Sequence, residues 1–149
     1  MGDALKAQGK LQLALKAYQA EAVAAKSAIK IDANDKYAPR DLVQAGSNIG
    51  AVAYDFILAR EFAKALDAAD IANSFAPGEV WIHARRAHAL MFLGRTAEAR
   101  NIYIIFRGQK SNGDKSWEAD VLSDFADLRK HRLSHPLMDE IKKLFRAPK

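Results

Sequence analysis

Cysteine is absent from this chain of 149 residues, so disulfide bonds, thiolate zinc sites and a cysteine nucleophile are excluded. Long apolar runs are also missing, because charged or polar residues interrupt every hydrophobic stretch well short of the roughly 20 residues that span a bilayer. A signal peptide is not recognisable either, since Asp3, Lys6 and Lys10 interrupt the start of the sequence. We therefore expect a globular domain without a membrane span, and the cytoplasm is the default compartment.

Proline is scarce, and each of the four, Pro39, Pro77, Pro136 and Pro148, stands where a helix can begin or end. Half of the residues are hydrophobic and 28% are charged, which suits one domain with a single core. Alanine, leucine, lysine and glutamate favour helix, and no long stretch alternates with a period of two. These features predict an all-α fold. The net charge of +5 is a modest basic excess that identifies no partner by itself.

Apolar residues recur every three or four positions in successive segments, which is the spacing of one helix face. The expected helices cover residues 3–8, 11–29, 42–56, 62–72, 80–91, 99–106, 117–128 and 136–144. Gly94 and Gly108 are expected to end two of them, and Ser116 is a suitable N-cap for another. Residues 109–114 form a polar break that contains the turn sequence Asn112-Gly113-Asp114.

Two pairs of alanines are separated by 34 residues: Ala53 with Ala87, and Ala65 with Ala99. A fixed period of this size is the signature of a repeat architecture. A third, upstream copy of the pattern begins at Gly9. The sequence therefore predicts stacked units of equal length, with small residues where their helices meet.

This pattern resembles the tetratricopeptide repeat, a helix–turn–helix unit with small residues at its helix contacts, an aromatic residue in its second helix and often a closing proline. The middle unit carries the resemblance through Ala53, Phe56, Phe62, Ala65, Ala72 and Pro77. The next unit carries it through Ala87, Leu90, Gly94, Ala99 and Tyr103, although Phe106 replaces a small residue and no proline closes the unit. The first unit carries it through Gly2, Leu5, Gly9, Ala14 and Tyr18.

The first unit departs from the family because its closing segment arrives seven residues late. Seven residues are about two helical turns, so we expect a lengthened second helix with its stripe on one face. Gly2 corresponds to a position inside a family helix, so we also expect the chain to be a fragment of a longer protein or to be completed by an upstream element.

The resemblance implies a right-handed α-solenoid of about three helix pairs with a C-terminal helical cap. Its repeats would cover residues 1–110, with boundaries at 1–38, 39–78 and 79–110, and the cap would cover 111–149. In the family, the first helix of each pair lines a shared concave face. Here that face carries apolar and aromatic side chains without lysine or arginine, with Arg85 at its rim.

An uncharged, aromatic concavity is typical of a groove that takes a peptide or a helix. We therefore expect a non-catalytic protein-interaction scaffold that needs no cofactor. The expected partner-binding residues are Tyr54, Ile57, Trp81, Arg85, His88, Met91 and Phe92. Two interpretations are open: the groove receives a partner, or the last helix of the protein itself fills it. One peptide-binding subclass of the family grips a C-terminal carboxylate with lysine, asparagine and arginine side chains on this face. Only Arg85 matches that set here, so we expect this clamp to be absent.

Other patterns are weaker. His83 and His88 fall on different helix faces, and Pro136 separates His131 from His135, so a metal site with Asp127 is not expected. Asp124 and Asp127 are interpreted as part of a solvated helix face. No phosphate-binding or nucleophile motif occurs.

Two alternative functions are open: a regulatory or assembly segment of a larger multidomain enzyme, and nucleic-acid binding through the basic residues between positions 85 and 115. Those residues are Arg85, Arg86, Arg95, Arg100, Arg107, Lys110 and Lys115.

Overall fold

The computed structural model describes residues 9–147, which are mostly helical. The helices are α2 (Leu11–Ile31), α3 (Ala38–Leu58), α4 (Phe62–Phe75), α5 (Trp81–Phe92), α6 (Thr96–Ile105), α7 (Trp117–Lys130) and α8 (Pro136–Arg146). Two short antiparallel strands, β1 (Lys110–Asn112) and β2 (Lys115–Ser116), separate α6 from α7. The all-α prediction is confirmed apart from this hairpin, and the helix expected over 3–8 lies outside the described residues.

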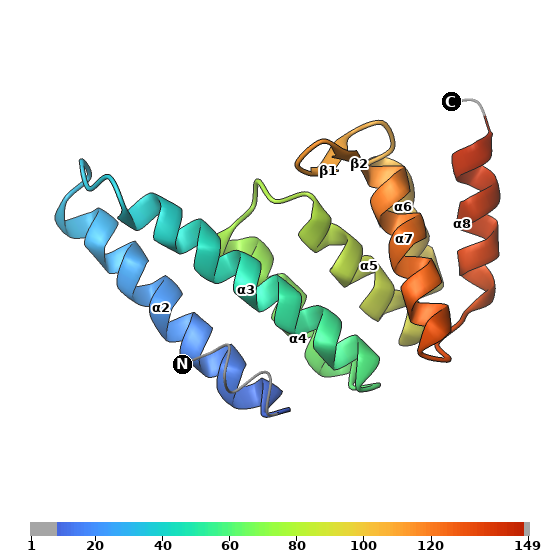
Figure 1. Ribbon diagram of the computed structural model, residues 1–149, viewed down its shortest axis with the longest axis horizontal. Coiled ribbons are helices and arrows are strands. Elements are labelled where there is room, and N and C mark those ends of the chain that lie inside the picture. Colours follow the sequence, from blue (N-terminus) through green and yellow to red (C-terminus); the bar gives the residue numbers. More distant parts are fainter. Residues whose placement is uncertain (1–8, 148–149) are drawn as a thin grey trace.

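Successive helices pack side by side along the molecule (Figure 1). Helix α3 packs between α2 and α4, and α5 packs between α4 and α6. Helix α5 also contacts α3 and α7, so these three form one layer, which we call the α3–α5–α7 face. Helix α8 ends the row and contacts α6 and α7.

The helix boundaries follow local chemistry that the sequence displays. The Ser116 side chain accepts a hydrogen bond from the Ala119 backbone N–H at 3.1 Å, which confirms it as the N-cap of α7. Gly94 has a φ of +83° just beyond α5, a conformation that glycine adopts without the cost that a Cβ imposes. Gly113 has a φ of +60° in the turn between β1 and β2, as the turn sequence indicates.

Helices α2 and α3 are the longest, with 21 residues each, whereas the other described helices have 10 to 14. The lengthened helix expected from the late closing segment is therefore present, and α3 is lengthened with it. The additional turns carry the α2–α3 hairpin beyond the rest of the row (Figure 1, blue and cyan).

Small residues lie where helices cross. The four alanines of the 34-residue period, Ala53, Ala65, Ala87 and Ala99, are all completely buried. Gly50 lies against Trp81, and a Cβ on this glycine would be 2.8 Å from the indole ring. Such contacts leave no room for larger side chains and hold neighbouring helices close together.

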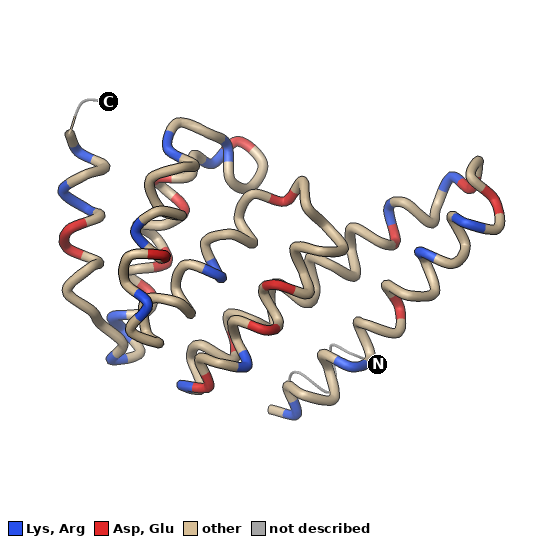
Figure 2. The backbone as a smooth tube through the Cα atoms, turned by 180° about the vertical axis from the view of Figure 1, so that it is seen from behind, with Lys and Arg blue, Asp and Glu red and all other residues tan. Residues whose placement is uncertain are grey.

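Charged residues of both signs are interspersed along most helices (Figure 2). Helix α5 is an exception, because it carries Arg85 and Arg86 but no acidic residue. None of the described helices has the length and apolarity that crossing a bilayer would require.

Candidate functional site

Three of the expected binding residues meet on the α3–α5–α7 face. Tyr54 comes from α3, and Trp81 and Arg85 come from α5. The guanidinium carbon of Arg85 lies 4.5 Å from the centroid of the Tyr54 ring and 5.3 Å from that of the Trp81 ring. At these distances the cation is attracted to both aromatic rings. Tyr54 and Trp81 therefore lie on the same side of the molecule.

Helix α7 supplies carboxylates to the same face. Asp124 accepts hydrogen bonds from Arg85 and from Nε2 of His88, the latter at 2.9 Å. Asp127 accepts a hydrogen bond from the Tyr54 hydroxyl at 2.7 Å. The protein's own side chains thus occupy much of the expected groove, and they come from α7 rather than from the last helix.

The solvated face expected for Asp124 and Asp127 is wrong for Asp124, whose side chain is only 13% exposed. Burial raises the pKa of Asp124, but the hydrogen bonds and charges of His88 and Arg85 outweigh it, so the pKa lies below its ordinary value. Asp124 is consequently ionised at neutral pH and forms a charge-assisted link between α5 and α7.

His88 lies completely buried behind this link. Its Nδ1 is 2.6 Å from the Tyr103 hydroxyl, and its Nε2 contacts Asp124. Burial and the charge of Asp124 raise the pKa of Tyr103 well above 10.0, and burial together with the hydrogen bond to Asp127 raises that of Tyr54. Both phenols stay protonated near neutral pH, so the network joins helices and offers no tyrosinate for catalysis.

Three of the remaining expected residues are packed inside the protein, and the fourth, Phe92, is partly buried. Ile57, His88 and Met91 are completely buried, so the expectation that they touch a partner does not hold for this structure. Phe92 stacks on Phe62 with their ring centroids 4.9 Å apart. His88 is a core position because α7 lies against α5 and supplies Asp124, and Met91 is one because the Tyr103 side chain of α6 lies against it.

Asp124, Asp127 and Tyr103 were missed as members of this network. One signal in the sequence could have found them: Arg85 and His88 are three residues apart and share a helix face with apolar neighbours. A buried cation and a buried imidazole both need polar partners. An acidic residue on another helix was therefore required, and α7 carries two near its centre and end.

Among residues 9–147, no three histidine or acidic side chains lie close enough together to hold a metal ion. Nδ1 of His131 is 3.9 Å from a carboxylate oxygen of Asp127. His135 instead caps α8, since its Nδ1 accepts a hydrogen bond from the Leu137 backbone N–H at 3.0 Å. His83 stacks on Phe106 with a centroid distance of 4.5 Å.

The basic residues between positions 85 and 115 are engaged within the protein. Their partners are Asp124 for Arg85, Asp70 for Arg86, Glu98 for Arg95, Glu140 for Arg100, the Ala147 carbonyl for Arg107, Asp114 for Lys110 and Asp120 for Lys115. They come from α5, from α6 and its flanking residues, and from the β1–β2 hairpin.

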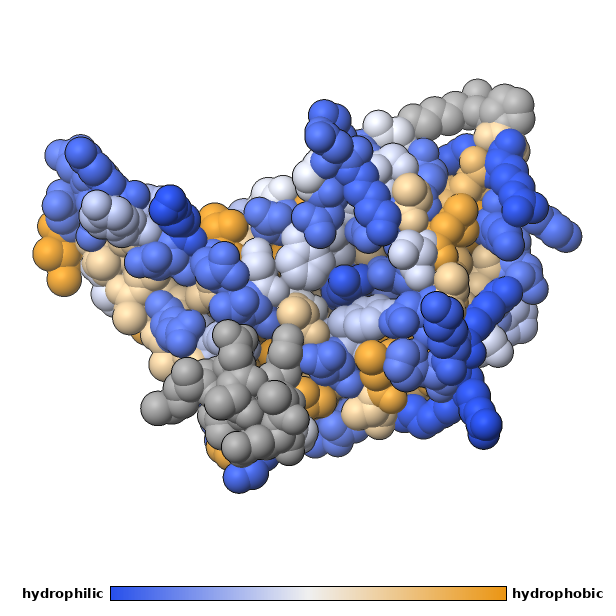
Figure 3. All heavy atoms as spheres, viewed as in Figure 1, coloured by the Kyte–Doolittle hydropathy of each residue, from blue (hydrophilic) through white to orange (hydrophobic). Residues whose placement is uncertain are grey.

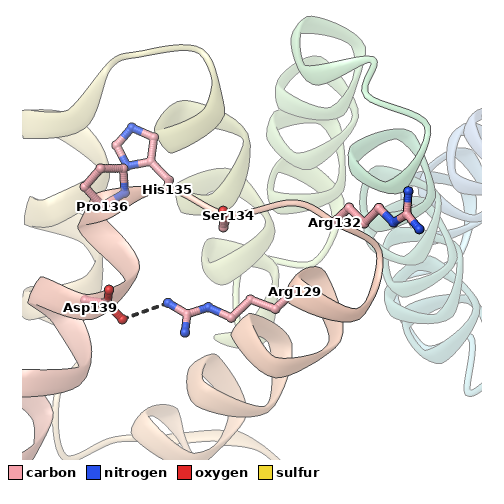
Figure 4. Close-up of a pocket in the computed structure, with 6 residues that line it drawn as sticks. All are labelled: Arg129, Arg132, Ser134, His135, Pro136 and Asp139. Carbon is pink, nitrogen blue, oxygen red and sulfur yellow. Dashed lines mark hydrogen bonds and ion pairs between the residues drawn. The ribbon is translucent and has the colours of Figure 1, made fainter.

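A cavity of about 770 Å³ lies at the corner between α7 and α8. Its lining residues are Arg129, Arg132, Ser134, His135, Pro136 and Asp139 (Figure 4). Arg129 donates a hydrogen bond to Asp139 at 2.8 Å, and the Arg132 side chain points the opposite way. The two guanidinium groups do not converge, so this corner lacks the arrangement that would clamp an anion.

A second cavity, of about 510 Å³, lies between α2 and α3 beside their connecting loop. We call it the α2–α3 groove, and its lining residues are Glu21, Ala24, Ala25, Ala28, Asp35, Tyr37, Ala38, Asp41, Gln44 and Ala45. Hydrophobic surface is visible at this end of the molecule at the left edge of Figure 3. The Tyr37 side chain at its edge is 70% exposed.

Comparison with protein-family models, with curated proteins and with solved structures finds no match. The tetratricopeptide resemblance stays a prediction that depends on residue spacing.

Proposed function

We propose that this chain is a non-catalytic protein-interaction scaffold, built as a right-handed α-solenoid of tetratricopeptide-like helix pairs. Two observations support the architecture: each of α3, α4 and α5 packs between its sequence neighbours, and the alanines of the 34-residue period are all buried at helix contacts. Helix rows of this kind offer extended faces to partners, because each unit buries its apolar surface on its neighbours.

The distribution of exposed apolar side chains carries the proposal. Of the eight large hydrophobic residues that are exposed in the described part of the chain, five belong to the α2–α3 hairpin. These five are Leu13, Val23, Ile31, Tyr37 and Val43. Apolar residues scattered singly need no explanation, but five of eight on one hairpin favour this hairpin as the part of the molecule that a partner covers.

The position of this surface differs from the one that the sequence suggests. On the α3–α5–α7 face, Tyr54 and Arg85 already bind side chains of α7, so a partner would have to compete with an internal network. The α2–α3 hairpin has no such competitor among the described residues, and its apolar side chains stay in water. We therefore assign partner binding to the hairpin, and an adjacent domain of a longer chain could use the same surface.

Nucleic-acid binding has less support, because the cations that suggested it are paired with acidic side chains or a carbonyl. When these cations bind phosphates, counterions leave the nucleic acid, which favours binding. The loss of the existing ion pairs would offset that free-energy gain.

A photo-crosslinking residue placed at single positions in living cells tests the proposal. Tyr37 and Ile105 form a matched pair, since both are large and apolar and are 70% and 62% exposed at different ends of the row. We expect a discrete protein adduct from position 37 and none from position 105. A third probe at Trp81 reports on the α3–α5–α7 face.

Adducts from 81 but not from 37 would contradict the assignment to the hairpin. The scaffold function would be contradicted if positions 37 and 81 both gave no adduct, or if all three positions gave equal adducts. Circular dichroism of each labelled protein checks that the helices are intact.

A further inference from the structure

The chemistry of the α2–α3 groove indicates what kind of partner it fits, and this inference rests on the proposed scaffold function. Alanines make up half of its lining: Ala24, Ala25, Ala28, Ala38 and Ala45. A floor of methyl groups between two antiparallel helices lets the backbone of a third helix approach closely. The same helix-against-helix packing already joins α2 to α3 and α3 to α4.

The charged residues of the groove are all acidic. Glu21 comes from α2, Asp35 from the connecting loop and Asp41 from the first turn of α3, whereas no lysine, arginine or histidine lines the cavity. The chain as a whole carries a net charge of +5, so the groove has the opposite sign to the protein around it. Lys36 and Arg40 are near in sequence but do not line the cavity.

The three carboxylates differ in what they already bind. Oδ1 of Asp35 accepts the backbone N–H groups of Tyr37 at 2.8 Å and Ala38 at 3.0 Å, and these bonds lower its pKa. Asp35 therefore shapes the loop. Glu21 and Asp41 have no hydrogen-bonded or ionic side-chain partner among residues 9–147, and both are exposed. These two carboxylates are available to a ligand.

We propose that the α2–α3 groove binds a basic amphipathic helix of a partner protein. Small residues of that helix lie on the alanine floor, and lysine or arginine side chains beside them pair with Glu21 and Asp41. Charge complementarity selects this partner, because an acidic helix, a nucleic acid or an anionic membrane would meet the same carboxylates with like charge. The exposed Tyr37 ring at the groove edge packs on the aliphatic part of a basic side chain or on its cation.

Exposed ion pairs are individually weak and are screened by salt. The apolar floor therefore provides contact area, and the acidic rim provides selectivity. Binding of a basic helix is expected to weaken as salt is raised, toward the level of a neutral helix.

Three fluorescein-labelled synthetic peptides test this. They share one alanine face and differ only beside it, where they carry lysine, glutamine or glutamate. Fluorescence anisotropy at low salt is expected to give the tightest binding for the lysine peptide, weaker binding for the glutamine peptide and none for the glutamate peptide. Higher salt should reduce the difference between the first two.

Two pairs of variants locate the binding. Glu21→Lys should weaken the lysine peptide about tenfold and leave the glutamine peptide nearly unchanged, whereas Asp67→Lys, the same charge change at an exposed position of α4, should affect neither. Ala24→Gln should weaken both peptides by obstructing the floor, and Ala97→Gln, at an exposed position of α6, is its control.

Equal binding of the lysine and glutamine peptides, insensitive to Glu21→Lys but weakened by Ala24→Gln, would overturn the basic partner and leave the scaffold function intact. No binding of any peptide would overturn the groove as a helix site, while the crosslinking probes at positions 37, 81 and 105 decide the scaffold function separately. If sedimentation shows that Glu21→Lys changes the mass of the particle, a second copy of this chain occupies the groove and the proposal is wrong.

Discussion

Asp124 holds two basic side chains of α5 to α7. Its carboxylate accepts hydrogen bonds from Arg85 and His88, and the Arg85 guanidinium lies in turn beside the Tyr54 ring. The side chains of Arg85 and Asp124 are 16% and 13% exposed. In such surroundings an unpaired charge is expensive, because neither water nor another ion replaces the lost partner. The link therefore determines how firmly α7 is held.

Asp124→Asn is expected to destabilise the protein by about 2–4 kcal/mol, because it leaves Arg85 without its counter-charge. The pKa of Asp124 lies below its ordinary value of 3.8 in the folded protein. Its carboxylate thus contributes stability that is present above this ordinary value and lost as the pH falls through the lowered folded-state pKa. The stability difference between wild type and variant should shrink over that acidic window. Urea unfolding at several pH values measures it, with Asp67→Asn at an exposed position as control.

At the scale of the helices, alanine and glycine set the distances between elements. Ala65 of α4 and Ala99 of α6 occupy equivalent places in the 34-residue period, and both are completely buried. Gly50 of α3 lies directly against Trp81 of α5. A helix with larger residues at these positions could not approach its neighbour without moving it.

Ala65→Leu should destabilise the protein by about 1–3 kcal/mol, since the added side chain overfills a helix crossing. Ala99→Leu should have a similar effect in α6. Ala97→Leu is the matched control, because Ala97 is on the same helix but exposed. Thermal unfolding followed by circular dichroism compares the three proteins. An unchanged melting temperature for the buried variants would mean that the repeat register is incorrect.

At the scale of the whole molecule, the two described ends of the row differ. Helix α8 buries Leu137, Met138 and Ile141 and turns charged residues such as Lys142 and Lys143 to water. Helix α2 buries one face on α3 but leaves Val23 and Ile31 exposed. One end therefore carries a polar outer face, and the other carries apolar side chains on helices that extend beyond the rest of the row.

This difference predicts uneven local stability. The turns of α2 and α3 nearest their connecting loop, residues 26–31 and 38–42, should exchange backbone amide hydrogens faster than α5, because α5 is enclosed by α3, α4, α6 and α7. Hydrogen exchange followed by mass spectrometry measures both regions in one experiment. Equal protection would contradict the prediction, whereas a basic peptide bound in the α2–α3 groove should slow exchange in these turns.

The sequence alone determined the helical class, most helix boundaries, the lengthening of α2 and the burial of the period alanines. These follow from local rules: apolar spacing, glycine and proline at ends, and a serine cap, each of which acts within a few residues. It did not determine that Asp124 and Asp127 would bind side chains of α5 and α3, or that Ile57, His88 and Met91 would belong to the core. Only the tertiary structure decided this, because whether a helix face is open depends on which other helix packs across it. That helix can be far away in the sequence, and the periodicity of either helix does not reveal the pairing.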